Sequence, residues 1–469
     1  MKVYHISAEC YPVAKVGGLG DVVGALPKYQ NRLSVDASVI MPWYDRSFVK
    51  DHQFKSVFLG EIKLGAQLYQ YQVLKEKQNV LGFDLYLIRI PGLLDRKEVY
   101  GYADESIQFI AFQSALLHWL SIHEHDQILL HCHDHHSGLI PFFLEHCHEF
   151  KALKGTPTVG TVHNGQYQGW MDWQQAVLMP VFDWDQRGLL DWDGVINPLA
   201  ALIKCCWAYT TVSKGYLEEL FLDANGLEAL FSSEKQKSHG IVNGIDTEVW
   251  NPSKDSLIPY NYHQAEMDGK QKNKKAFCKQ FGFTYRLPLF SFIGRLVYEK
   301  GADLLPFFIE EMMNTYSGKV NFIVLGSGDP VIEKELLILQ NKYADNVGVT
   351  IGYDEVLSHK IYASSDFLFM PSRVEPCGLN QLYAMRYGTM PIVRKTGGLA
   401  DTVVDISSGG FGISFENDEV PAMLEAVERS LVLFKRKALL KQKRNDMMEQ
   451  DFSWETSARK YIDIYKSLI

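Results

Sequence analysis

A carboxylate followed by proline, cysteine and glycine is the feature of this sequence that most directly suggests chemistry. Glu375 stands in the run Pro371-Ser372-Arg373-Val374-Glu375-Pro376-Cys377-Gly378-Leu379-Asn380-Gln381-Leu382. Proline fits the first position of a helix, so we expect a helix from Pro376 to about Tyr387. A helix start offers unpaired N–H groups and the positive end of a dipole. We therefore expect Glu375 to lie at an anion-binding terminus, where a sugar hydroxyl and a phosphate can be held side by side.

Two glycine turns of similar sequence stand in opposite halves of the chain. One is Lys15-Val16-Gly17-Gly18-Leu19-Gly20-Asp21, and the other is Thr396-Gly397-Gly398-Leu399-Ala400-Asp401. Glycine lets backbone N–H groups at a helix start approach a ligand closely, and such turns suit phosphates. The repetition suggests two phosphate-handling loops that face one another.

Arg295 and Lys300 stand five residues apart, on the loop between a predicted strand and a helix that Gly301 begins. Both side chains can converge on one diphosphate, arginine as a two-pronged donor and lysine as a point charge. The alternative is two surface cations at a helix start. A helix dipole disfavours cations there unless an anion is bound, which weakens that alternative.

Histidines are concentrated in one segment. Nine of the 15 histidines fall between His118 and His148, including four in the run His131-Cys132-His133-Asp134-His135-His136. A metal site is one interpretation. Neighbours on a strand point to opposite faces, so only alternate members can share an ion, and the spacing matches no zinc pattern. We therefore predict no functional metal. His163 stands apart, at the carboxyl end of an apolar strand, where a histidine can be structural or catalytic.

Four tryptophans crowd the segment after His163: Trp170, Trp173, Trp184 and Trp192. Aromatic faces suit sugar rings, so these side chains can be platforms for a carbohydrate. They can equally be aromatics that fill the core under a long loop.

Short apolar runs that alternate with amphipathic segments must position these residues. In the first half the predicted strands are Val3–Ser7, Ala37–Met41, Leu85–Ile90, Ile128–Cys132, Thr158–Val162 and Ala208–Val212. In the second half they are Leu287–Gly294, Val320–Gly326, Val349–Gly352, Asp366–Pro371 and Met390–Lys395. Many end in a polar or glycine-rich loop that leads into a helix. This is the pattern of an α/β protein with parallel sheets and ligand groups at the carboxyl ends of the strands.

The chain of 469 residues is too long for one ordinary core, so we expect two α/β domains. They meet near Ile241–Asp246, read as a short strand and an Asn-Gly turn. The segment Asn251–Lys275 is polar and lysine-rich, and we expect a surface excursion there. In the last segment Trp454, Ala458, Tyr461, Ile462, Tyr465 and Leu468 recur at helical spacing and give one apolar face.

Composition excludes several classes of protein. The charge is −9, with no long basic run, so we expect no nucleic-acid partner. No run of about 18 apolar residues exists and the N-terminus reads as a strand, so we expect neither a membrane segment nor a signal peptide. Seven scattered cysteines fit reduced thiols in the cytoplasm.

Taken together, the motifs resemble bacterial glycogen synthase and plant starch synthase. The resemblance rests on Lys15-Val16-Gly17-Gly18-Leu19, Thr161-Val162-His163-Asn164, Asn243-Gly244-Ile245-Asp246, Gly294-Arg295 with Lys300-Gly301, and Glu375-Pro376-Cys377-Gly378-Leu379. Single glycine turns are weak signals, but five motifs in family order across the whole chain are specific.

The resemblance implies a GT-B fold: two Rossmann-like domains with the active site in the cleft between them. The domains would be residues 1–240, on the acceptor side and completed by a returning helix at 455–469, and residues 241–454, which bind the nucleotide sugar. The implied reaction transfers glucose from ADP-glucose to the non-reducing end of an α-1,4-glucan and retains the α configuration.

The resemblance also assigns roles to residues. Arg295 and Lys300 would bind the diphosphate, Lys15 and Gly18 would contact phosphate or glucose, and His163 would lie beside the transferred glucose. Glu375 would position the glucose 3- and 4-hydroxyls rather than act as a nucleophile, because the leaving diphosphate accepts the acceptor's proton. Further substrate contacts are expected from Gly17, Asp21, Asp134, Asn164, Asn243, Cys377, Gly378, Leu379, Thr396, Gly397 and Gly398. No cofactor or metal is implied.

Three positions depart from the family pattern. Gly20 replaces the usual alanine, which adds backbone freedom. His135 stands where tryptophan is usual, and Gly165-Gln166 replaces an apolar pair. The last two changes lie near the expected sugar site and bear on acceptor preference and fine donor geometry. Alternative functions are a related GT-B transferase that uses UDP-glucose or another acceptor, and a non-catalytic nucleotide-sugar or glucan-binding protein.

Overall fold

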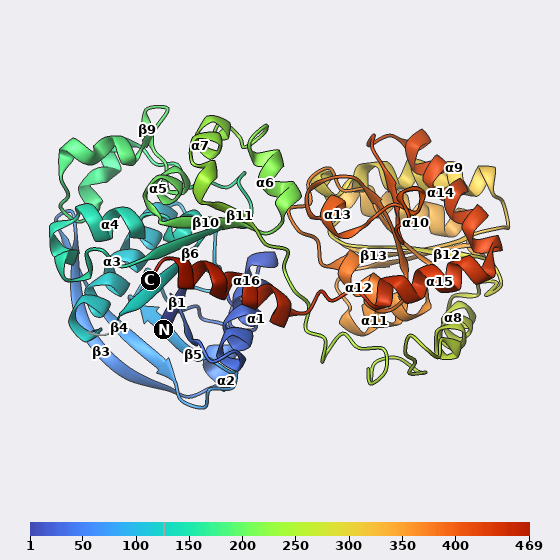
Figure 1. The fold of residues 1–469 in the computed structure, drawn as a ribbon, viewed down its shortest axis with the longest axis horizontal. Helices are drawn as coiled ribbons and strands as arrows, with labels where there is room; N and C mark the ends of the chain where they lie inside the picture. Colours follow the sequence, from blue (N-terminus) through green and yellow to red (C-terminus); the bar gives the residue numbers. More distant parts are fainter. Residues whose placement is uncertain (125–126) are drawn as a thin grey trace. The chain divides into compact units, whose positions relative to one another are not determined.

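The computed structural model describes residues 1–124 and 127–469, which form two compact units. The first consists of Met1–Gly244 with Trp454–Ile469, and the second of Ile245–Ser453. Each unit contains a sheet covered by helices, mostly parallel in the first unit and fully parallel in the second, so the predicted α/β class is confirmed (Figure 1). The units divide four residues after the predicted boundary at 240 and one residue before the predicted start of the returning helix at 455.

The first unit contains a nine-stranded sheet in the order β11-β10-β7-β6-β1-β2-β5-β4-β3. The strands are β1 (Lys2–Ile6), β2 (Asp36–Pro42), β3 (Phe54–Leu64), β4 (Gln67–Glu76), β5 (Asp84–Arg89), β6 (Ile128–His133), β7 (Thr158–Val162), β10 (Ala208–Thr211) and β11 (Ser238–Gly240), with a separate hairpin of β8 (Asp191–Trp192) and β9 (Val195–Ile196). All six predicted strands are present and parallel.

The antiparallel pair β3 and β4 was not predicted. From Phe58 to Leu64, exposed residues of β3 alternate with partly or fully buried ones, because an edge hairpin keeps one face in water. The search for apolar runs therefore missed both strands. The short strand expected at Ile241 was misplaced, since β11 ends at Gly240.

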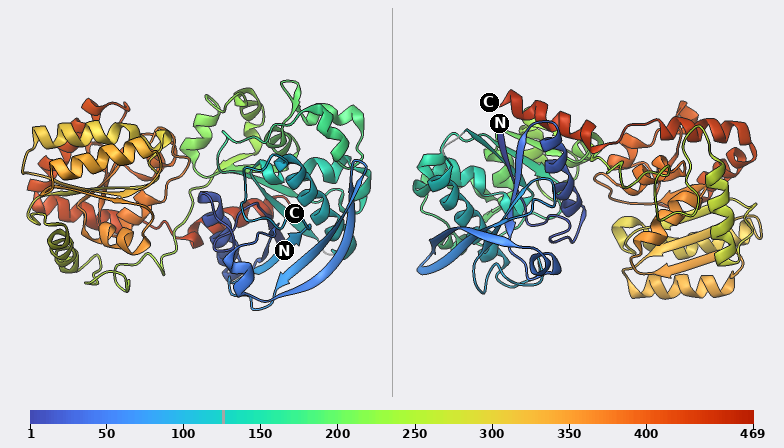
Figure 2. Two further views of the ribbon diagram at one scale, coloured as in Figure 1. Left: turned by 180° about the vertical axis from the view of Figure 1, so that it is seen from behind. Right: turned by 90° about the horizontal axis from the view of Figure 1, so that it is seen from below.

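Helices cover both faces of this sheet (Figure 2). They are α1 (Gly18–Arg32), α2 (Ser47–Asp51), α3 (Glu105–His123), α4 (Ile140–His146), α5 (Pro198–Cys205), α6 (Lys214–Leu220), α7 (Glu228–Ser233) and α16 (Trp454–Ser467). Short 3-10 helices lie at His135–Ser137, His148–Leu153, Trp173–Leu178, Trp184–Leu189 and Lys235–Lys237.

Helix α16 returns to the first unit and packs beside α1, as predicted (Figure 1). Its apolar face is buried with Val3, Val22 and Leu26 in one hydrophobic cluster. Tyr465 accepts a hydrogen bond from the Gln30 side chain at 3.0 Å. Burial of each large side chain contributes about 1.5–3 kcal/mol, so the helix is an integral part of this unit.

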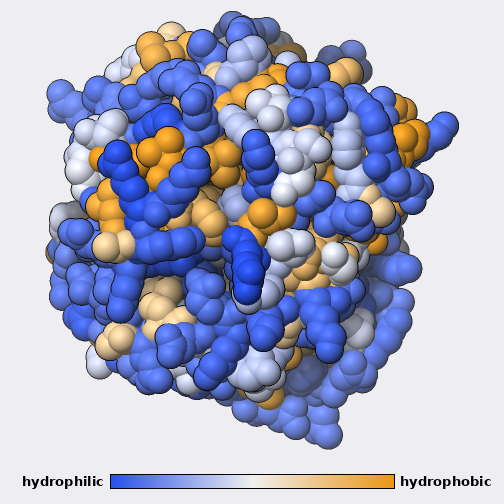
Figure 3. All heavy atoms as spheres, turned by 90° about the vertical axis from the view of Figure 1, so that its right-hand side faces the viewer, coloured by the Kyte–Doolittle hydropathy of each residue, from blue (hydrophilic) through white to orange (hydrophobic). Residues whose placement is uncertain are grey.

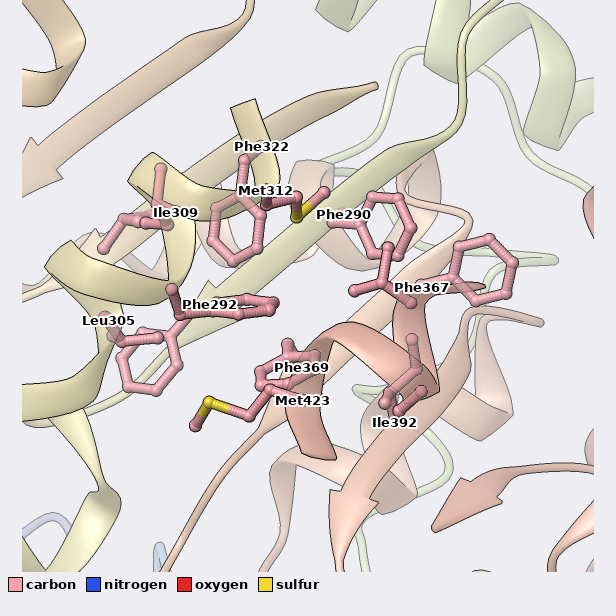
Figure 4. Packing of buried hydrophobic residues seen from close by; sticks show 14 of the residues in the cluster. Phe290, Phe292, Leu305, Ile309, Met312, Phe322, Phe367, Phe369, Ile392 and Met423 are labelled. Carbon is pink, nitrogen blue, oxygen red and sulfur yellow. The ribbon is translucent and has the colours of Figure 1, made fainter. Parts of the chain in front are cut away.

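The second unit contains a parallel sheet in the order β14-β13-β12-β15-β16-β17. The strands are β12 (Leu289–Ile293), β13 (Asn321–Gly326), β14 (Val347–Ile351), β15 (Phe367–Met370), β16 (Met390–Arg394) and β17 (Ile413–Phe415). All five predicted strands are present, and only the short edge strand β17 was missed. Figure 4 shows aromatic side chains of β12, β13 and β15 meeting the apolar face of the covering helices, which accounts for their apolar sequences.

The helices of this unit are α8 (Asp268–Phe281), α9 (Leu305–Thr315), α10 (Pro330–Lys342), α11 (Glu355–Ser364), α12 (Asn380–Arg386), α13 (Gly397–Thr402), α14 (Val420–Lys435) and α15 (Lys437–Met448). Short 3-10 helices lie at Tyr298–Lys300, Ala302–Leu304 and Ile406–Ser408. The helix expected to begin at Gly301 therefore starts as a 3-10 turn that leads into α9.

The surface excursion predicted for Asn251–Lys275 is wrong in its second part. Helix α8 covers residues from 268 onward, and Lys270 and Lys274 are buried. Lys270 donates to the carbonyl oxygens of Tyr362 and Tyr387 at 3.1 and 2.8 Å. Lys274 pairs with the buried carboxylate of Asp366. Specific acceptors in the core, which sequence polarity does not reveal, hold these lysines inside.

On the face in Figure 3 hydrophilic side chains predominate, and hydrophobic ones are scattered in small groups. Among the helices of the described residues, none has the length and apolar character needed to cross a membrane.

Candidate active site

Three loops of the second unit meet at the carboxyl edge of its sheet. They follow β12, β15 and β16, which are neighbouring parallel strands, so their ends lie at the same edge. The loop after β12 carries Arg295 and Lys300, the loop after β15 carries Glu375, and the loop after β16 carries the second glycine turn. The predicted residues of this half of the chain are therefore gathered in one place.

Lys300 and Glu375 form a tight ion pair. The ammonium donates to both carboxylate oxygens at 2.7 Å, and the Ser372 hydroxyl donates to Oε2 at 2.9 Å. Glu375 is only 7% exposed. Sequence analysis gave these two charges separate roles, missed their contact and did not identify Ser372.

Close backbone packing holds the first two loops together. Gly301 has φ +65°, and a Cβ there would lie 2.3 Å from the carbonyl oxygen of Pro371. The N–H of Arg373 donates to the carbonyl of Glu299 at 2.8 Å. Only glycine fits position 301, so Lys300 is delivered to Glu375 at a fixed separation.

The glycine turn is joined to the same loop. The N–H of Gly398 donates to the carbonyl of Glu375 at 3.0 Å, and a Cβ at Gly398 would lie 2.2 Å from the carbonyl oxygen of Cys377. Thr396 precedes α13 and is buried, as is Cys377. The turn thus presents a short helix start beside the carboxylate loop.

The helix expected to begin at Pro376 begins at Asn380, so that prediction is wrong. Gly378 has φ +74°, and the Gln381 amide donates to the carbonyls of Cys377 and Gly378, each at 3.0 Å. These contacts stabilise a loop that includes Leu379. Glu375 consequently lies in the loop rather than at a helix terminus, and its charge is balanced by Lys300.

Arg295 is exposed, unlike the half-buried Lys300. Within residues 1–124 and 127–469, its guanidinium has no hydrogen-bond or ion-pair partner. The structure places both cations on one loop and joins only Lys300 to another predicted residue. All five donor N–H groups of Arg295 are therefore available to an anion.

In the first unit, backbone N–H groups of the loop after β1 are hydrogen-bonded to a side chain of the same loop. The N–H groups of Val16 and Gly17 donate to the buried carboxylate of Glu9, the latter at 2.9 Å. The hydroxyl of Tyr100 donates to the other oxygen of Glu9 at 2.7 Å. Glu9 was not predicted, although its place just beyond the first strand could have drawn attention to it.

Lys15 forms an ion pair with Asp21 at 2.6 Å and lies over the Tyr11 ring. A Cβ added at Gly17 or Gly18 would meet no atom within 4 Å, so the protein itself does not require glycine at either position. The open space on this side is compatible with a ligand.

Glycine at position 20 leaves room for neighbouring side chains and is not needed for backbone freedom. It lies inside α1, and a Cβ there would be 3.2 Å from Cβ and Cγ of Lys15 and 3.3 Å from an oxygen of Glu9. The absent methyl group therefore lets Lys15 fold back toward Asp21. This replaces the predicted explanation for the departure from the family pattern.

Asp134 and His163 come together because β6 and β7 are adjacent. The backbone N–H of His163 donates to Oδ1 of Asp134 at 2.7 Å. Asp134 has φ 55° and ψ −172°, a strained conformation for a residue with a side chain. Burial raises the pKa of its carboxyl to about 7, although backbone donors at His163 and Asn164 act the other way. Strain and a raised pKa at one residue are typical of functional sites.

His163 is buried, and burial lowers its pKa to about 3. Its imidazole is therefore neutral at physiological pH. Its Nε2 lies 3.0 Å from Nδ1 of His133. If His163 interacts with positive charge at an anomeric carbon, as predicted, it does so as a neutral ring that offers a lone pair.

His5, His131 and His133 form the centre of the histidine cluster. They lie on one face of adjacent strands β1 and β6, as alternation requires, and one nitrogen of each lies within 4.8 Å of the others. Every one of their six ring nitrogens has a hydrogen-bond partner. His125 lies outside the described residues, and His135 packs against His136.

The two predicted asparagines lie in different parts of the first unit. Oδ1 of Asn164 accepts from the N–H of Gln166 at 3.0 Å, which shapes the loop after His163. Asn243 is buried at the end of the first unit.

The tryptophans do not simply fill a core. Trp170 and Trp184 are each 56% exposed, whereas Trp173 and Trp192 are half-buried. Trp173 and Trp184, with centroids 6.1 Å apart, line an open depression of about 700 Å³ together with Asp185, Arg187, Gly188 and Asp191. A smaller cavity of about 260 Å³ beside α12 and α15 contains no predicted site residue.

Comparison with known proteins agrees with the motifs. Residues 2–233 match the family described as starch synthase catalytic domain, and residues 273–445 match glycosyl transferases group 1. The chain is 48% identical over 470 residues to a glycogen synthase of Flavobacterium johnsoniae, covering 100% of this chain and 99% of that protein. It is 36% identical over 498 residues to a glycogen synthase of Thermodesulfovibrio yellowstonii, covering 100% and 98%.

Solved structures show the same fold. The catalytic domain of starch synthase IV from Arabidopsis thaliana, bound to ADP and acarbose, matches with a TM-score of 0.88 and 32% identity over 100% of this chain and 99% of that chain. A sucrose-phosphate synthase of Thermosynechococcus elongatus, 16% identical with a TM-score of 0.61 over 100% and 98%, shares the fold. The predicted GT-B fold is confirmed. The full-length matches and the two domain matches show that the chain belongs to the glycogen and starch synthase family of glycosyltransferases.

Proposed function

We propose that the protein transfers glucose from ADP-glucose to the non-reducing end of an α-1,4-glucan with retention of configuration. The observation that carries the proposal is the Lys300–Glu375 pair, joined to the Gly398 turn at one sheet edge in a chain of this family. The ADP and acarbose bound by starch synthase IV support a nucleotide diphosphate donor and a glucan-like acceptor.

The diphosphate would be bound by Arg295, Lys300 and the glycine turn. Arg295 has free donors, and the three N–H bonds of Lys300 allow a phosphate contact in addition to those with Glu375. Gly397 at the start of α13 would provide a backbone N–H group, and Gly398, whose own N–H is bonded to the Glu375 carbonyl, would hold the turn against that loop. Lys15 beside Gly18 would supply a further cation. Cations and backbone donors can then stabilise the negative charge of the departing diphosphate without a metal.

The transferred glucose would be held by hydrogen bonds to polar side chains and to the backbone. Glu375 would accept hydrogen bonds from its 3- and 4-hydroxyls, and the Cys377–Leu379 backbone would contact the same ring. His163, Asp134, Asn164 and Asn243 would bind the remaining hydroxyls, and Asp21 would orient Lys15.

The proposed chemistry takes place on one face of the sugar. The bond from the anomeric carbon to the diphosphate oxygen breaks as the bond from that carbon to the acceptor's 4-oxygen forms. The acceptor's hydroxyl proton passes to the departing diphosphate oxygen. No protein nucleophile is needed, which agrees with Glu375 being already paired with Lys300. We further propose a cytoplasmic location, which the lack of a disulfide among the seven cysteines supports.

Incorporation of labelled glucose into glycogen tests the function. We expect transfer from ADP-glucose in excess EDTA, and much slower transfer from UDP-glucose. Faster transfer from UDP-glucose would favour the related-transferase alternative. ADP binding without transfer from either donor would favour a non-catalytic binding protein. Loss of transfer on chelation, restored by zinc or magnesium, would overturn metal independence.

A further inference from the structure

A continuous chain of buried hydrogen bonds connects His163 to the C-terminal helix. From Nε2 of His163 it passes to Nδ1 of His133 at 3.0 Å, and from Nε2 of His133 to Nδ1 of His5 at 3.0 Å. Nε2 of His5 then lies 2.7 Å from Oε1 of Gln30, and Nε2 of Gln30 donates to the Tyr465 hydroxyl at 3.0 Å. All these residues belong to the first unit.

A second branch continues from the same hydroxyl. Nδ1 of His131 lies 2.6 Å from the Tyr465 oxygen, and Nε2 of His131 lies 2.6 Å from the hydroxyl of Thr161. Thr161 in turn bonds the hydroxyl of Thr210 at 2.6 Å. Both branches therefore meet at Tyr465, which is fully buried on α16.

Each histidine in this series of hydrogen bonds is neutral at physiological pH. Burial lowers the pKa of His5 to about 4, and it lowers those of His131 and His133 well below the usual value. A neutral imidazole carries one N–H donor and one lone pair. A hydrogen bond made by one ring nitrogen therefore dictates what the other nitrogen can do.

The direction of the chain follows from Gln30. Its Nε2 donates to Tyr465, so its Oε1 can only accept, and Nε2 of His5 must be the donor. The lone pair of His5 is then on Nδ1 and accepts from Nε2 of His133. By the same step, Nδ1 of His133 accepts from Nε2 of His163. The remaining nitrogen of His163, Nδ1, keeps a lone pair.

We propose that Gln30 and Tyr465, acting through His5 and His133, are positioning residues that hold His163 in the tautomer protonated on Nε2. Nδ1 of His163 is then an acceptor for a hydroxyl of the donor glucose. The second part rests on the proposed function, whereas the tautomer does not. The proposal also gives the histidine cluster a role without a metal, because its lone pairs are engaged in hydrogen bonds.

The tautomer can be measured directly in the full-length protein. With ¹⁵N-labelled histidine, two-bond ¹H–¹⁵N correlation spectra identify which ring nitrogen carries the proton, and a His163→Gln sample assigns the signal. We expect the proton of His163 on Nε2. A proton on Nδ1 would show that the chain runs in the opposite direction and would overturn the proposal. So would one equivalent of zinc in the purified protein, because an ion would need the same lone pairs.

Two variants interrupt the chain at different points. Tyr465→Phe removes the hydroxyl that fixes the Gln30 amide, and Gln30→Met removes the acceptor for His5. We expect both tautomers of His163 to be populated in each folded variant, and kcat to fall about threefold to tenfold while ADP affinity stays within about twofold. Gln30→Glu restores an acceptor for His5, so it should restore the single tautomer and most of kcat.

Tyr461→Phe is the matched control. Tyr461 is also buried on α16, one turn earlier, but its hydroxyl makes none of the bonds in this chain. We expect it to leave the tautomer and kcat unchanged. An unaltered tautomer in both Tyr465→Phe and Gln30→Met would overturn the proposal. Failure of the wild type to transfer glucose from ADP-glucose would instead contradict the proposed function and leave the tautomer result intact.

Discussion

The Lys300–Glu375 pair concentrates opposite charges in a part of the second unit that is mostly shielded from water. Glu375 is 7% exposed, so its carboxylate depends on Lys300 and Ser372 for stabilisation. Loss of one partner of such a pair leaves an uncompensated charge. The pair therefore sets both the local electrostatics and the position of each side chain.

Replacement of either cation by alanine should slow transfer. A charge-assisted contact with a phosphate contributes roughly 1.5–3 kcal/mol, so Lys300→Ala and Arg295→Ala should each lower kcat/KM at least about tenfold to hundredfold. The measurement is steady-state transfer from ADP-glucose. Lys395→Ala is the control, because Lys395 is a surface cation paired with Glu416. Near-normal rates in both test variants would rule out this diphosphate site.

Glu375→Gln should reduce turnover substantially but leave ADP binding within a few-fold, because the variant keeps shape and one acceptor oxygen while it loses charge. Calorimetry with ADP and transfer assays separate the two effects. Mass spectrometry of wild-type enzyme quenched after mixing with ADP-glucose should show no hexose adduct. A stable adduct on Glu375 would make that residue a nucleophile.

Asp134→Asn should stabilise the protein at neutral pH. Burial raises the folded-state pKa of Asp134 to about 7, so between about pH 4 and 7 the unfolded chain has released a proton that the folded state retains. Wild-type stability consequently falls as pH rises through that interval and then levels off. The variant lacks this penalty, and its advantage in free energy of unfolding should grow from none near pH 4 to about 4 kcal/mol above pH 7.

Urea unfolding at several pH values checks this prediction. Asparagine can still accept the hydrogen bond from the His163 N–H, so the loop should keep its shape. We expect transfer activity to fall in the same variant. If the variant's gain in free energy of unfolding did not depend on pH, the substitution would act by relieving backbone strain rather than by removing a buried charge.

At the scale of elements, short 3-10 helices in the first unit expose aromatic side chains. The helices Trp173–Leu178 and Trp184–Leu189 bring two tryptophan rings to the edge of one depression. Trp173 is fixed by a hydrogen bond from its indole N–H to Asp191 at 2.7 Å. A rigid ring beside an exposed one can stack on a sugar at little entropic cost.

Trp184→Ala should weaken binding of glycogen. Stacking contributes about 0.5–1.5 kcal/mol beyond area burial, so we expect the KM for glycogen to rise about threefold to tenfold and the KM for ADP-glucose to stay constant. Trp207→Ala is the matched control, since Trp207 is 43% exposed and does not line the depression. Equal effects of the two substitutions would argue against a specific glucan contact.

At the scale of the whole molecule, the chain leaves the first unit after Gly244 and returns to it at Trp454. The last helix thus packs against the hydrophobic core around the first strand, β1. Deletion of residues 454–469 removes Trp454, Tyr461 and Tyr465, each worth about 1.5–3 kcal/mol. Their sum is comparable with the total stability of a domain, about 5–15 kcal/mol.

The truncated chain should therefore lose the first unit selectively. We expect limited proteolysis to leave a resistant fragment within residues 245–453, identified by mass spectrometry. Removal of Ile469 alone, which is half-exposed, should leave both units resistant. Protection of residues 1–244 in the chain without α16 would contradict the role given to this helix.

The sequence by itself determined the parallel strands, the place of His163 after β7, the returning helix and the family. Strands buried on both faces leave apolar runs, and a helix with one buried face leaves a periodic pattern, so both can be recognised from neighbouring residues alone.

Tertiary structure decided which charged side chains meet. Lys300 and Glu375 lie 75 residues apart, and their contact depends on two loops brought together by adjacent strands. Glu9 satisfies the amides of the first glycine turn, and Lys274 is buried because Asp366 is within reach. Gly378 interrupts the helix expected at Pro376 because its backbone is left-handed, a conformation held by bonds from the Gln381 amide to the carbonyls of Cys377 and Gly378. Such contacts depend on distances in space, which no pattern of neighbouring residues records.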